Sequence, residues 1–227
     1  MVPVLARDGL LAGGASSRAM RGQERDIAVL FCDLRGFTGL TEKRLPFDTV
    51  FILNRYFETV GRAVEDAGGH MDKFIGDGAL ALFGLDTDPR TAARQAVDAA
   101  LRIHAGVADL NELYASELDH PLQIAMSLHA GPAVVGEMGY GAAMNLTAVG
   151  DTLNAASRLE GLAKDFDVEI VISEDLAALA GLDLDDREHR TLAMRGRTQP
   201  IGAWIIPDAS DLSSRLALEG SPPPGGG

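Results

Sequence analysis

Residues 71–83 read MDKFIGDGALALF. Two apolar runs, Met71–Ile75 and Ala79–Phe83, flank the tripeptide Gly76-Asp77-Gly78. An Asp-Gly pair between two such runs is a strong hairpin signal, because tight hairpin turns need positive φ angles. We therefore predict two short antiparallel strands joined by a turn that contains Asp77.

Helix and strand signals alternate on both sides of this hairpin. Upstream, a short apolar strand (26–33) precedes a helix that begins at Pro46 and ends before two glycines at 68–69. Downstream, a helix begins after Pro89, and residues 122–129 alternate between apolar and polar as a half-buried strand does. The order β-α-β-β-α-β is that of the ferredoxin-like unit.

Further elements extend this core towards the C-terminus. We predict a strand at 147–150, a helix through Arg158 to Lys164, a strand at 168–172 and final strands between 192 and 206. The predicted class is α+β, a ferredoxin-like βαββαβ core with additional strands and helices. Its helices are expected to pack on a mainly antiparallel sheet.

Composition divides the chain into three parts. Residues 1–25 are rich in Gly, Ala, Ser and Arg and are predicted to be a linker or connector. Residues 26–207 carry the periodic apolar pattern and form the predicted folded domain. Residues 208–227 end in SPPPGGG and are predicted to be a disordered tail, because they carry too little apolar content to fold.

The bulk composition excludes some classes of protein. The 227 residues carry a formal net charge of −13, which argues against a nucleic-acid binder, because such proteins need a basic surface for the phosphates. The longest apolar runs are far shorter than the ~20 residues of a membrane-spanning helix. The single cysteine, Cys32, cannot form an internal disulfide, which is typical of a reducing compartment. We expect an acidic cytoplasmic domain.

Two acidic residues are expected to meet at one edge of the predicted sheet. Asp33 ends the first strand and Asp77 lies in the hairpin, and in a βαββ unit that strand lies beside the hairpin. Two close carboxylates repel each other unless one is protonated or a cation intervenes. Mg²⁺ prefers such oxygen ligands. The spacing alone is equally compatible with a metal site and with a turn residue plus a strand-end cap.

Two further segments carry groups suited to phosphates. Residues 34–39 read LRGFTG, in which Gly36 permits close backbone approach and Thr38 can open a short helix whose free N–H groups suit phosphate oxygens. Asn154 and Arg158 are four residues apart and share one face of a helix, where they can orient a ribose and neutralise a phosphate. Taken singly, each segment also fits an ordinary turn or an exposed polar face.

Three cationic residues remain ambiguous on sequence alone. Lys73 is either an exposed strand lysine or a donor to the edge of a base. Arg195 and Arg197 precede the last strand and either hold a triphosphate or lie on the surface. The five histidines show no metal-ligand spacing.

Three motifs considered together are far more specific than any one of them. They read FCDLRGFT (31–38), KFIGDG (73–78) and VGDTLNAASRLE (149–160). The set resembles the three main motifs of class III adenylate/guanylate cyclase catalytic domains. The resemblance covers roughly Arg25 to Pro207, with the motifs in the family's order and spacing.

The resemblance implies a metal and phosphate site in the first two motifs. Asp33 and Asp77 are expected to hold two divalent metal ions, Mg²⁺ or Mn²⁺, with the Leu34 carbonyl as an extra ligand. The turn Gly36-Phe37-Thr38 is expected to receive the β- and γ-phosphates.

The third motif and the C-terminal region are implied to act on the sugar and the phosphates. Asn154 is expected to orient the ribose, and Arg158 to stabilise the charged transition state at the α-phosphate. Arg195 stands where family members usually have a triphosphate-binding lysine, a substitution that keeps the charge and changes the geometry.

Lys73 and Thr147 occupy the family's base-recognition positions. Lysine donates and cannot accept, so it suits N1 of adenine and clashes with N1–H of guanine, while threonine can accept from the adenine amino group. The resemblance therefore implies an adenylate cyclase that converts ATP to cyclic AMP. The same pair also resembles the subgroup that includes bicarbonate-responsive cyclases. A guanylate or dual-specificity cyclase and a nucleotide-binding regulatory module without turnover remain the alternatives.

The resemblance also implies a homodimer. In the family each site lies between two subunits, with the metal aspartates from one and the lysine, threonine, asparagine and arginine from the other. This chain carries every part, so two equivalent sites are expected. Residues 1–25 are expected to connect to an upstream sensor or membrane domain in a longer protein.

Overall fold

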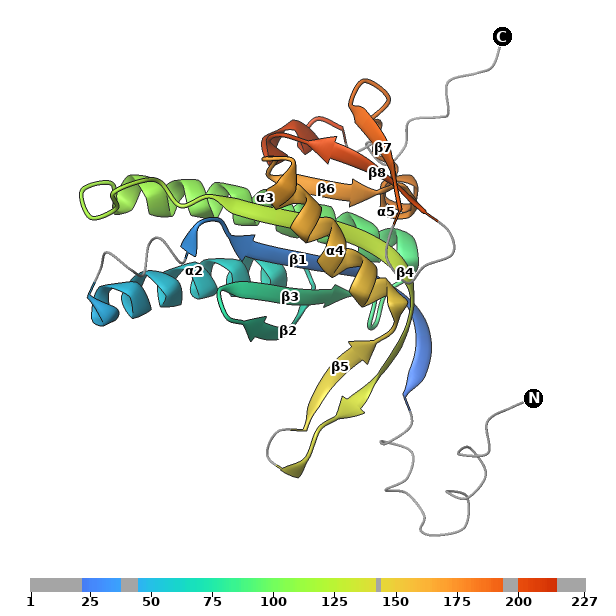
Figure 1. The fold of residues 1–227 in the computed structure, drawn as a ribbon. Coiled ribbons are helices and arrows are strands. Elements are labelled where there is room, and N and C mark those ends of the chain that lie inside the picture. Colours follow the sequence, from blue (N-terminus) through green and yellow to red (C-terminus); the bar gives the residue numbers. More distant parts are fainter. Residues whose placement is uncertain (1–21, 38–44, 142–143, 194–199, 216–227) are drawn as a thin grey trace.

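The computed structural model describes residues 22–37, 45–141, 144–193 and 200–215. Within these residues eight strands form one sheet, and four α-helices and a short 3-10 helix accompany it (Figure 1). In chain order the elements are β1 (Gln23–Leu34), α2 (Pro46–Asp66), β2 (His70–Ile75), β3 (Gly78–Phe83), α3 (Pro89–Leu113), β4 (Ile124–Met138), β5 (Asn145–Val149), α4 (Asp151–Asp165), β6 (Ile170–Ser173), α5 (Glu174–Ala180), β7 (Glu188–Leu192), β8 (Ile201–Ile206) and η3 (Ala209–Leu212).

The sheet confirms the predicted ferredoxin-like core. Its strand order is β2-β3-β1-β4-β6-β8-β7, with β5 paired to β4. The first four strands along the chain take the order β2-β3-β1-β4, and all of their pairings are antiparallel. Among the described strands only β4 and β6 run parallel. The fold is therefore α+β on a mainly antiparallel sheet, as the sequence predicts.

Helices cover the two faces of the sheet unequally. Alternate residues of β1 such as Leu30 face the core built with α2, α3 and α5. Their neighbours, such as Val29, face the other side, where α4 and the β4–β5 ribbon lie. Figure 1 shows α4 crossing one face of the sheet while α2 and α3 lie on the opposite face. Because side chains alternate along a strand, Asp33 lies on the α4 side together with Val29.

Proline and a capping aspartate set where the two long helices begin. Pro46 and Pro89 each occupy the first turn, where a missing N–H leaves no hydrogen bond unmade. The carboxylate of Asp88 accepts hydrogen bonds from the backbone N–H groups of Arg90 and Thr91, at 3.0 and 3.1 Å. Both helices start where the sequence predicts.

Strand β4 is longer than the predicted strand 122–129, because it continues past Pro132 into a ribbon with β5. Pro132 pairs with Asp26 of β1 on one side. On its other side β6 has already ended and β5 has not yet begun, so the missing N–H of proline costs no ladder bond. The ribbon extends away from the body of the sheet and carries Thr147 (Figure 1).

Some details of the structure differ from the sequence predictions. The β2–β3 turn contains Asp77 as predicted, but the residue with positive φ is Gly76 (65°) and not a member of the Asp-Gly pair. Helix α5 was not predicted, and β1 begins three residues inside the expected linker. The tail predicted from residue 208 is wrong for η3, since Ala209 and Leu212 are fully buried.

None of the helices among the described residues combines the length and apolar character that a membrane span requires.

Candidate active site

Asp33 and Asp77 lie together, as the topology predicts. The β1–β3 ladder pairs Cys32 with Ala79, which leaves Asp33 beside the start of β3 and the turn that carries Asp77. A Cβ atom placed on Gly78 would lie 3.5 Å from the carboxyl carbon of Asp33. A side chain at position 78 would therefore narrow the space around the Asp33 carboxylate, and glycine leaves this space open.

The proximity of the two carboxyl groups changes their electrostatics. Partial burial, together with the hydrogen bond and repulsion from Asp33, raises the pKa of Asp77 to about 6. The Asp33 oxygen Oδ1 is buried and has no hydrogen-bond partner among the described residues. The pair therefore carries more negative charge than its protein surroundings satisfy.

Among the described residues Lys164 supplies positive charge to the pair, a role that the sequence analysis did not assign to it. Its ammonium forms an ion pair with Oδ2 of Asp33 and lies 3.0 Å from Oε1 of Glu160, one turn earlier on α4. Burial lowers the pKa of Lys164, but the hydrogen bonds to the two carboxylates outweigh it and raise the pKa overall. Glu160, whose pKa is raised by burial, adds a third carboxyl group to the cluster.

Arg35 fixes the end of β1 against the end of α4. Its guanidinium donates to the carbonyl oxygens of Ala163 and Val168 and pairs with the carboxylate of Asp167. The carbonyl groups in the last turn of a helix have no partner within the helix, so the bond to Ala163 helps to cap α4, while the bond to Val168 holds the segment that follows it. The cap holds the segment that carries Lys164 next to Asp33.

The other residues of the predicted metal and phosphate site are only partly described. Leu34 is the last residue of β1, and its side chain is buried in the core. Gly36 follows in a turn with a φ of 64°, a left-handed conformation that favours glycine. Phe37 is half-buried and packs against the core. Thr38 and Arg195 lie outside the described residues.

The structure brings together the two predicted base-recognition residues. Lys73 on β2 donates from Nζ to Oγ1 of Thr147 on β5, at 3.1 Å. The two residues are 74 positions apart in sequence. The Thr147 residue is buried, whereas the Lys73 side chain is 47% exposed. The contact leaves about half of the Lys73 side chain exposed to solvent.

Asn154 and Arg158 are not brought to the carboxylate pair of the same chain. Both are exposed residues of α4. Asn154 precedes Lys164 by ten residues, which is about 15 Å along the helix axis. A cavity of about 500 Å³ lies between β3 and the β4–β5 ribbon, and neither Asp33 nor Asp77 lines it. Among the described residues, Asn154 and Arg158 are therefore separated from the Asp33–Asp77 pair within one chain.

The donor set at Asp33 and Asp77 fits a hard divalent cation. Two carboxyl groups converge, and one of their buried oxygens has no hydrogen-bond donor in the part of the chain that the structure describes. Mg²⁺ and Mn²⁺ take carboxylate oxygens of this kind and complete their shells with phosphate oxygens and water. These two residues would hold the metal ions that the sequence leads us to expect.

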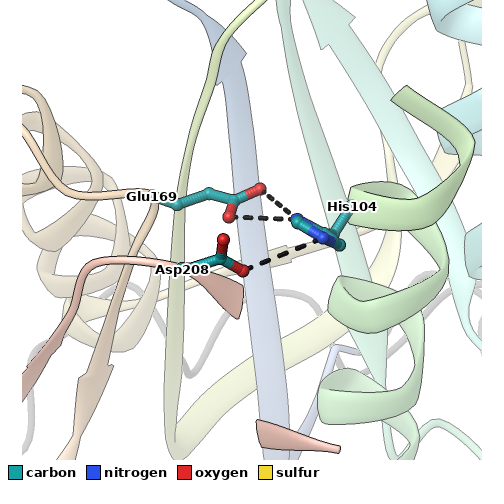
Figure 2. Close-up of side chains that lie close together, drawn as sticks. All are labelled: His104, Glu169 and Asp208. Atoms are coloured by element: carbon teal, nitrogen blue, oxygen red, sulfur yellow. Dashed lines mark hydrogen bonds and ion pairs between the residues drawn. The ribbon is translucent and has the colours of Figure 1, made fainter. Parts of the chain in front are cut away.

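A second polar cluster joins His104, Glu169 and Asp208 (Figure 2). His104 Nδ1 lies 2.8 Å from Oε1 of Glu169, while Nε2 faces Oδ1 of Asp208 at 3.8 Å. A metal ion would bind one ring nitrogen along its lone pair, whereas here each nitrogen faces a different carboxylate. Glu169 also accepts from the backbone N–H of Ala209 at 2.8 Å. We interpret the cluster as a structural link between α3, β6 and η3.

The sequence of the chain matches the model of a known protein family. Residues 20–207 match the family model described as the adenylate and guanylate cyclase catalytic domain. The match spans every described element from β1 to β8.

The chain is similar in sequence to individual curated proteins and similar in fold to solved structures. The chain is 33% identical over 168 residues to an adenylate cyclase from Anabaena cylindrica, which covers 72% of this chain and 31% of that protein. The chain thus spans about a third of the length of that relative. The crystal structure of the guanylyl cyclase Cya2 matches with a TM-score of 0.74 and 29% identity, covering 82% of this chain and 94% of that one. That of the adenylyl cyclase CyaB from P. aeruginosa matches with a TM-score of 0.73 and 28% identity, covering 83% and 97%.

The raised pKa of Asp77 makes a prediction about stability. A carboxyl group whose folded-state pKa is above its unfolded value destabilises the folded protein at a pH above both values, and this cost disappears as the pH falls below the unfolded value. Asp77→Asn should therefore raise the thermal midpoint of the metal-free protein at pH 7.5. The gain should shrink as the pH is lowered from about 6 towards 4.

Thermal unfolding followed by circular dichroism in the presence of EDTA measures this difference. Asp109→Asn makes the same chemical change at an exposed position of α3 and should leave the midpoint unchanged. An Asp77→Asn protein that is no more stable than the wild type at pH 7.5, or is equally stabilised at pH 4, would contradict the assigned electrostatics.

Proposed function

The chain belongs to the adenylate and guanylate cyclase catalytic domain family, and we propose that it converts ATP to 3′,5′-cyclic AMP and pyrophosphate. The observation that carries the choice of ATP is the hydrogen bond between Lys73 Nζ and Thr147 Oγ1. The bond places the Lys73 ammonium, which can only donate hydrogen bonds, next to the Thr147 hydroxyl, which can accept them. Adenine offers the complementary pair, an acceptor at N1 and a donor at its amino group.

The chain's own residues would act by positioning and by electrostatics. We propose that Asp33 and Asp77 bind two divalent ions, which would lower the pKa of the ribose 3′-hydroxyl and neutralise the phosphates. Asn154 would hold the ribose so that its 3′-oxygen is in line with the α-phosphorus and the leaving pyrophosphate. Arg158 would stabilise the negative charge that grows on the α-phosphate.

The backbone around Gly36 and the side chain of Arg195 are proposed to bind the triphosphate. Gly36 has no Cβ, and apart from its chain neighbours no heavy atom of the described residues lies within 4 Å of the position a Cβ would take. Backbone N–H groups after this turn could therefore approach phosphate oxygens closely. Among the described residues no side chain stands out as a general base for the 3′-hydroxyl, so positioning and charge are expected to supply most of the acceleration.

Each active site is proposed to lie between two copies of the chain. Asn154 and Arg158 are exposed on α4, away from the Asp33–Asp77 pair of their own chain. A second copy related by a two-fold axis would present its own Asn154 and Arg158 to that pair, and the reverse contact would follow by symmetry. In such a homodimer each of the two equivalent sites combines the carboxylate pair of one copy with the Asn154 and Arg158 of the other.

Guanylate cyclase activity is the second candidate, and two observations favour it. The chain is as similar to the guanylyl cyclase Cya2 as it is to the adenylyl cyclase CyaB. The Thr147 hydroxyl can also donate a hydrogen bond, so it does not exclude the carbonyl oxygen of guanine. The discrimination between the two bases therefore depends on Lys73.

The first prediction from the proposed function concerns catalytic turnover. With Mg²⁺ or Mn²⁺ the protein should form cyclic AMP from ATP at a higher kcat/KM than it forms cyclic GMP from GTP. Asp77→Ala should lower the rate at least about a hundredfold, because the metal ions that organise the phosphates lose a ligand. Product formation is measured by chromatography. Cyclic GMP as the main product would overturn the choice of ATP, and nucleotide binding without any product would favour a regulatory module.

The second prediction concerns the shared site. Asp77→Ala and Asn154→Ala should each be nearly inactive alone. In an equal mixture that exchanges subunits at random, half of the dimers are mixed and each of these carries one intact site. Activity should therefore recover to roughly a quarter of the wild-type value.

Mass spectrometry of differently tagged chains shows whether the mixed dimers have formed. A mixture of Asp77→Ala with Asp33→Ala is the matched control, because both changes remove the same half of the site and no intact site can arise. Mixed dimers that stay inactive, or recovery in the control mixture, would rule out the shared site.

A further inference from the structure

Asp72 is a fully buried carboxylate on an edge strand. The strand β2 lies at one end of the sheet, and its other residues are half-buried or exposed. The Asp72 side chain is nevertheless 0% exposed. The pairing of β2 with β3 shifts between Met71 and Lys73, so Asp72 is an extra residue without a partner in the ladder. Such a bulge re-aims the side chain that it carries.

The charge of Asp72 has one compensating partner among the described residues. Neither carboxylate oxygen has a hydrogen-bond donor in the part of the chain that the structure describes. The Lys73 ammonium lies 2.8 Å from Oδ2, an ion pair without hydrogen-bond geometry. An isolated buried carboxylate is costly, and a nearby opposite charge is what offsets the cost. The attraction between Asp72 and Lys73 therefore acts at short range, and its carboxylate end is shielded from solvent.

The two contacts of Lys73 together fix the position of its ammonium. The lysine side chain is flexible, and an exposed one samples many rotamers. Here Nζ is attracted to Asp72 on one side and donates to Thr147 at 3.1 Å on another. A lysine ammonium has three N–H donors, so it retains donor capacity towards solvent, where the side chain is 47% exposed. A ligand would meet this donor in a fixed place.

We propose that Asp72 is a positioning residue that holds the Lys73 ammonium against Thr147 and thereby sets the preference for adenine over guanine. The inference rests on the proposed function, in which Lys73 meets N1 of the base. A fixed ammonium donates to N1 of adenine and cannot avoid N1–H of guanine. A mobile ammonium can turn away from N1–H, and the penalty against guanine then falls.

The test is the ratio of the two binding affinities. The dissociation constants of 3′-deoxy-ATP and 3′-deoxy-GTP, which lack the attacking hydroxyl, are measured by calorimetry on the full chain with Mg²⁺. We expect the wild type to favour the adenine analogue and Asp72→Asn to lower this preference about tenfold, the size expected for a contact to a charged group. Both constants come from one preparation, so a partial loss of folded protein leaves their ratio unchanged.

Two further variants complete the design. Asp109→Asn removes a carboxylate on the exposed side of α3 and should keep the wild-type ratio. If Asp72→Asn does not fold, Asp72→Ser removes the charge with a smaller side chain and is measured in the same way. A preference within twofold of the wild type in the folded Asp72 variant would overturn the proposal.

Product formation separates this inference from the proposed reaction. A wild-type protein that binds 3′-deoxy-ATP preferentially but makes no cyclic AMP from ATP would contradict the proposed function. The ratio of the two dissociation constants would still decide the role of Asp72. A wild type that makes cyclic AMP, with a ratio unaffected by Asp72→Asn, would contradict the inference alone.

Discussion

The antiparallel pairing of β1 with β3 is the constraint on which the candidate site depends. The ladder runs as far as Cys32 and Ala79, and this places Asp33 beside the turn that carries Asp77. Burial, and after it the closeness of Asp33, raises the pKa of Asp77, so holding the two carboxyl groups here in their charged form costs free energy. The Lys164 ammonium offsets part of that cost from α4. The fold thus maintains a pair of like charges whose natural complement is a cation.

Helix α4 connects the two halves of the proposed chemistry. Its C-terminal part carries Lys164 and is capped by Arg35, so it is tied to the metal-binding end of β1. Its exposed residues Asn154 and Arg158 are directed to a second copy in the proposed homodimer. A change in one site that displaces Lys164 from Asp33 would act on the helix that serves the other site. The fold therefore gives the two proposed sites a physical connection through a single rigid element.

Local signals in the sequence were sufficient for most of the fold and for part of the site. Proline and glycine positions predicted both long helices, and the family resemblance implied a shared role in base recognition for Lys73 and Thr147, which the structure places in contact. The contact of Lys164 with Asp33 could not be predicted, because a lysine near a helix end resembles any surface lysine until β1 is placed against it. The burial of Asp72 could not be predicted from the sequence for another reason. A one-residue bulge breaks the two-residue period from which the direction of a strand side chain is inferred.

A crystal structure with Mn²⁺ and 3′-deoxy-ATP, with manganese located by its anomalous scattering, tests the central claim most directly. That claim is that the carboxylate pair is a metal site for a nucleotide triphosphate. We expect manganese between Asp33 and Asp77, with the triphosphate bound to it. Manganese at the cluster of His104, Glu169 and Asp208, with none at the carboxylate pair, would contradict the account.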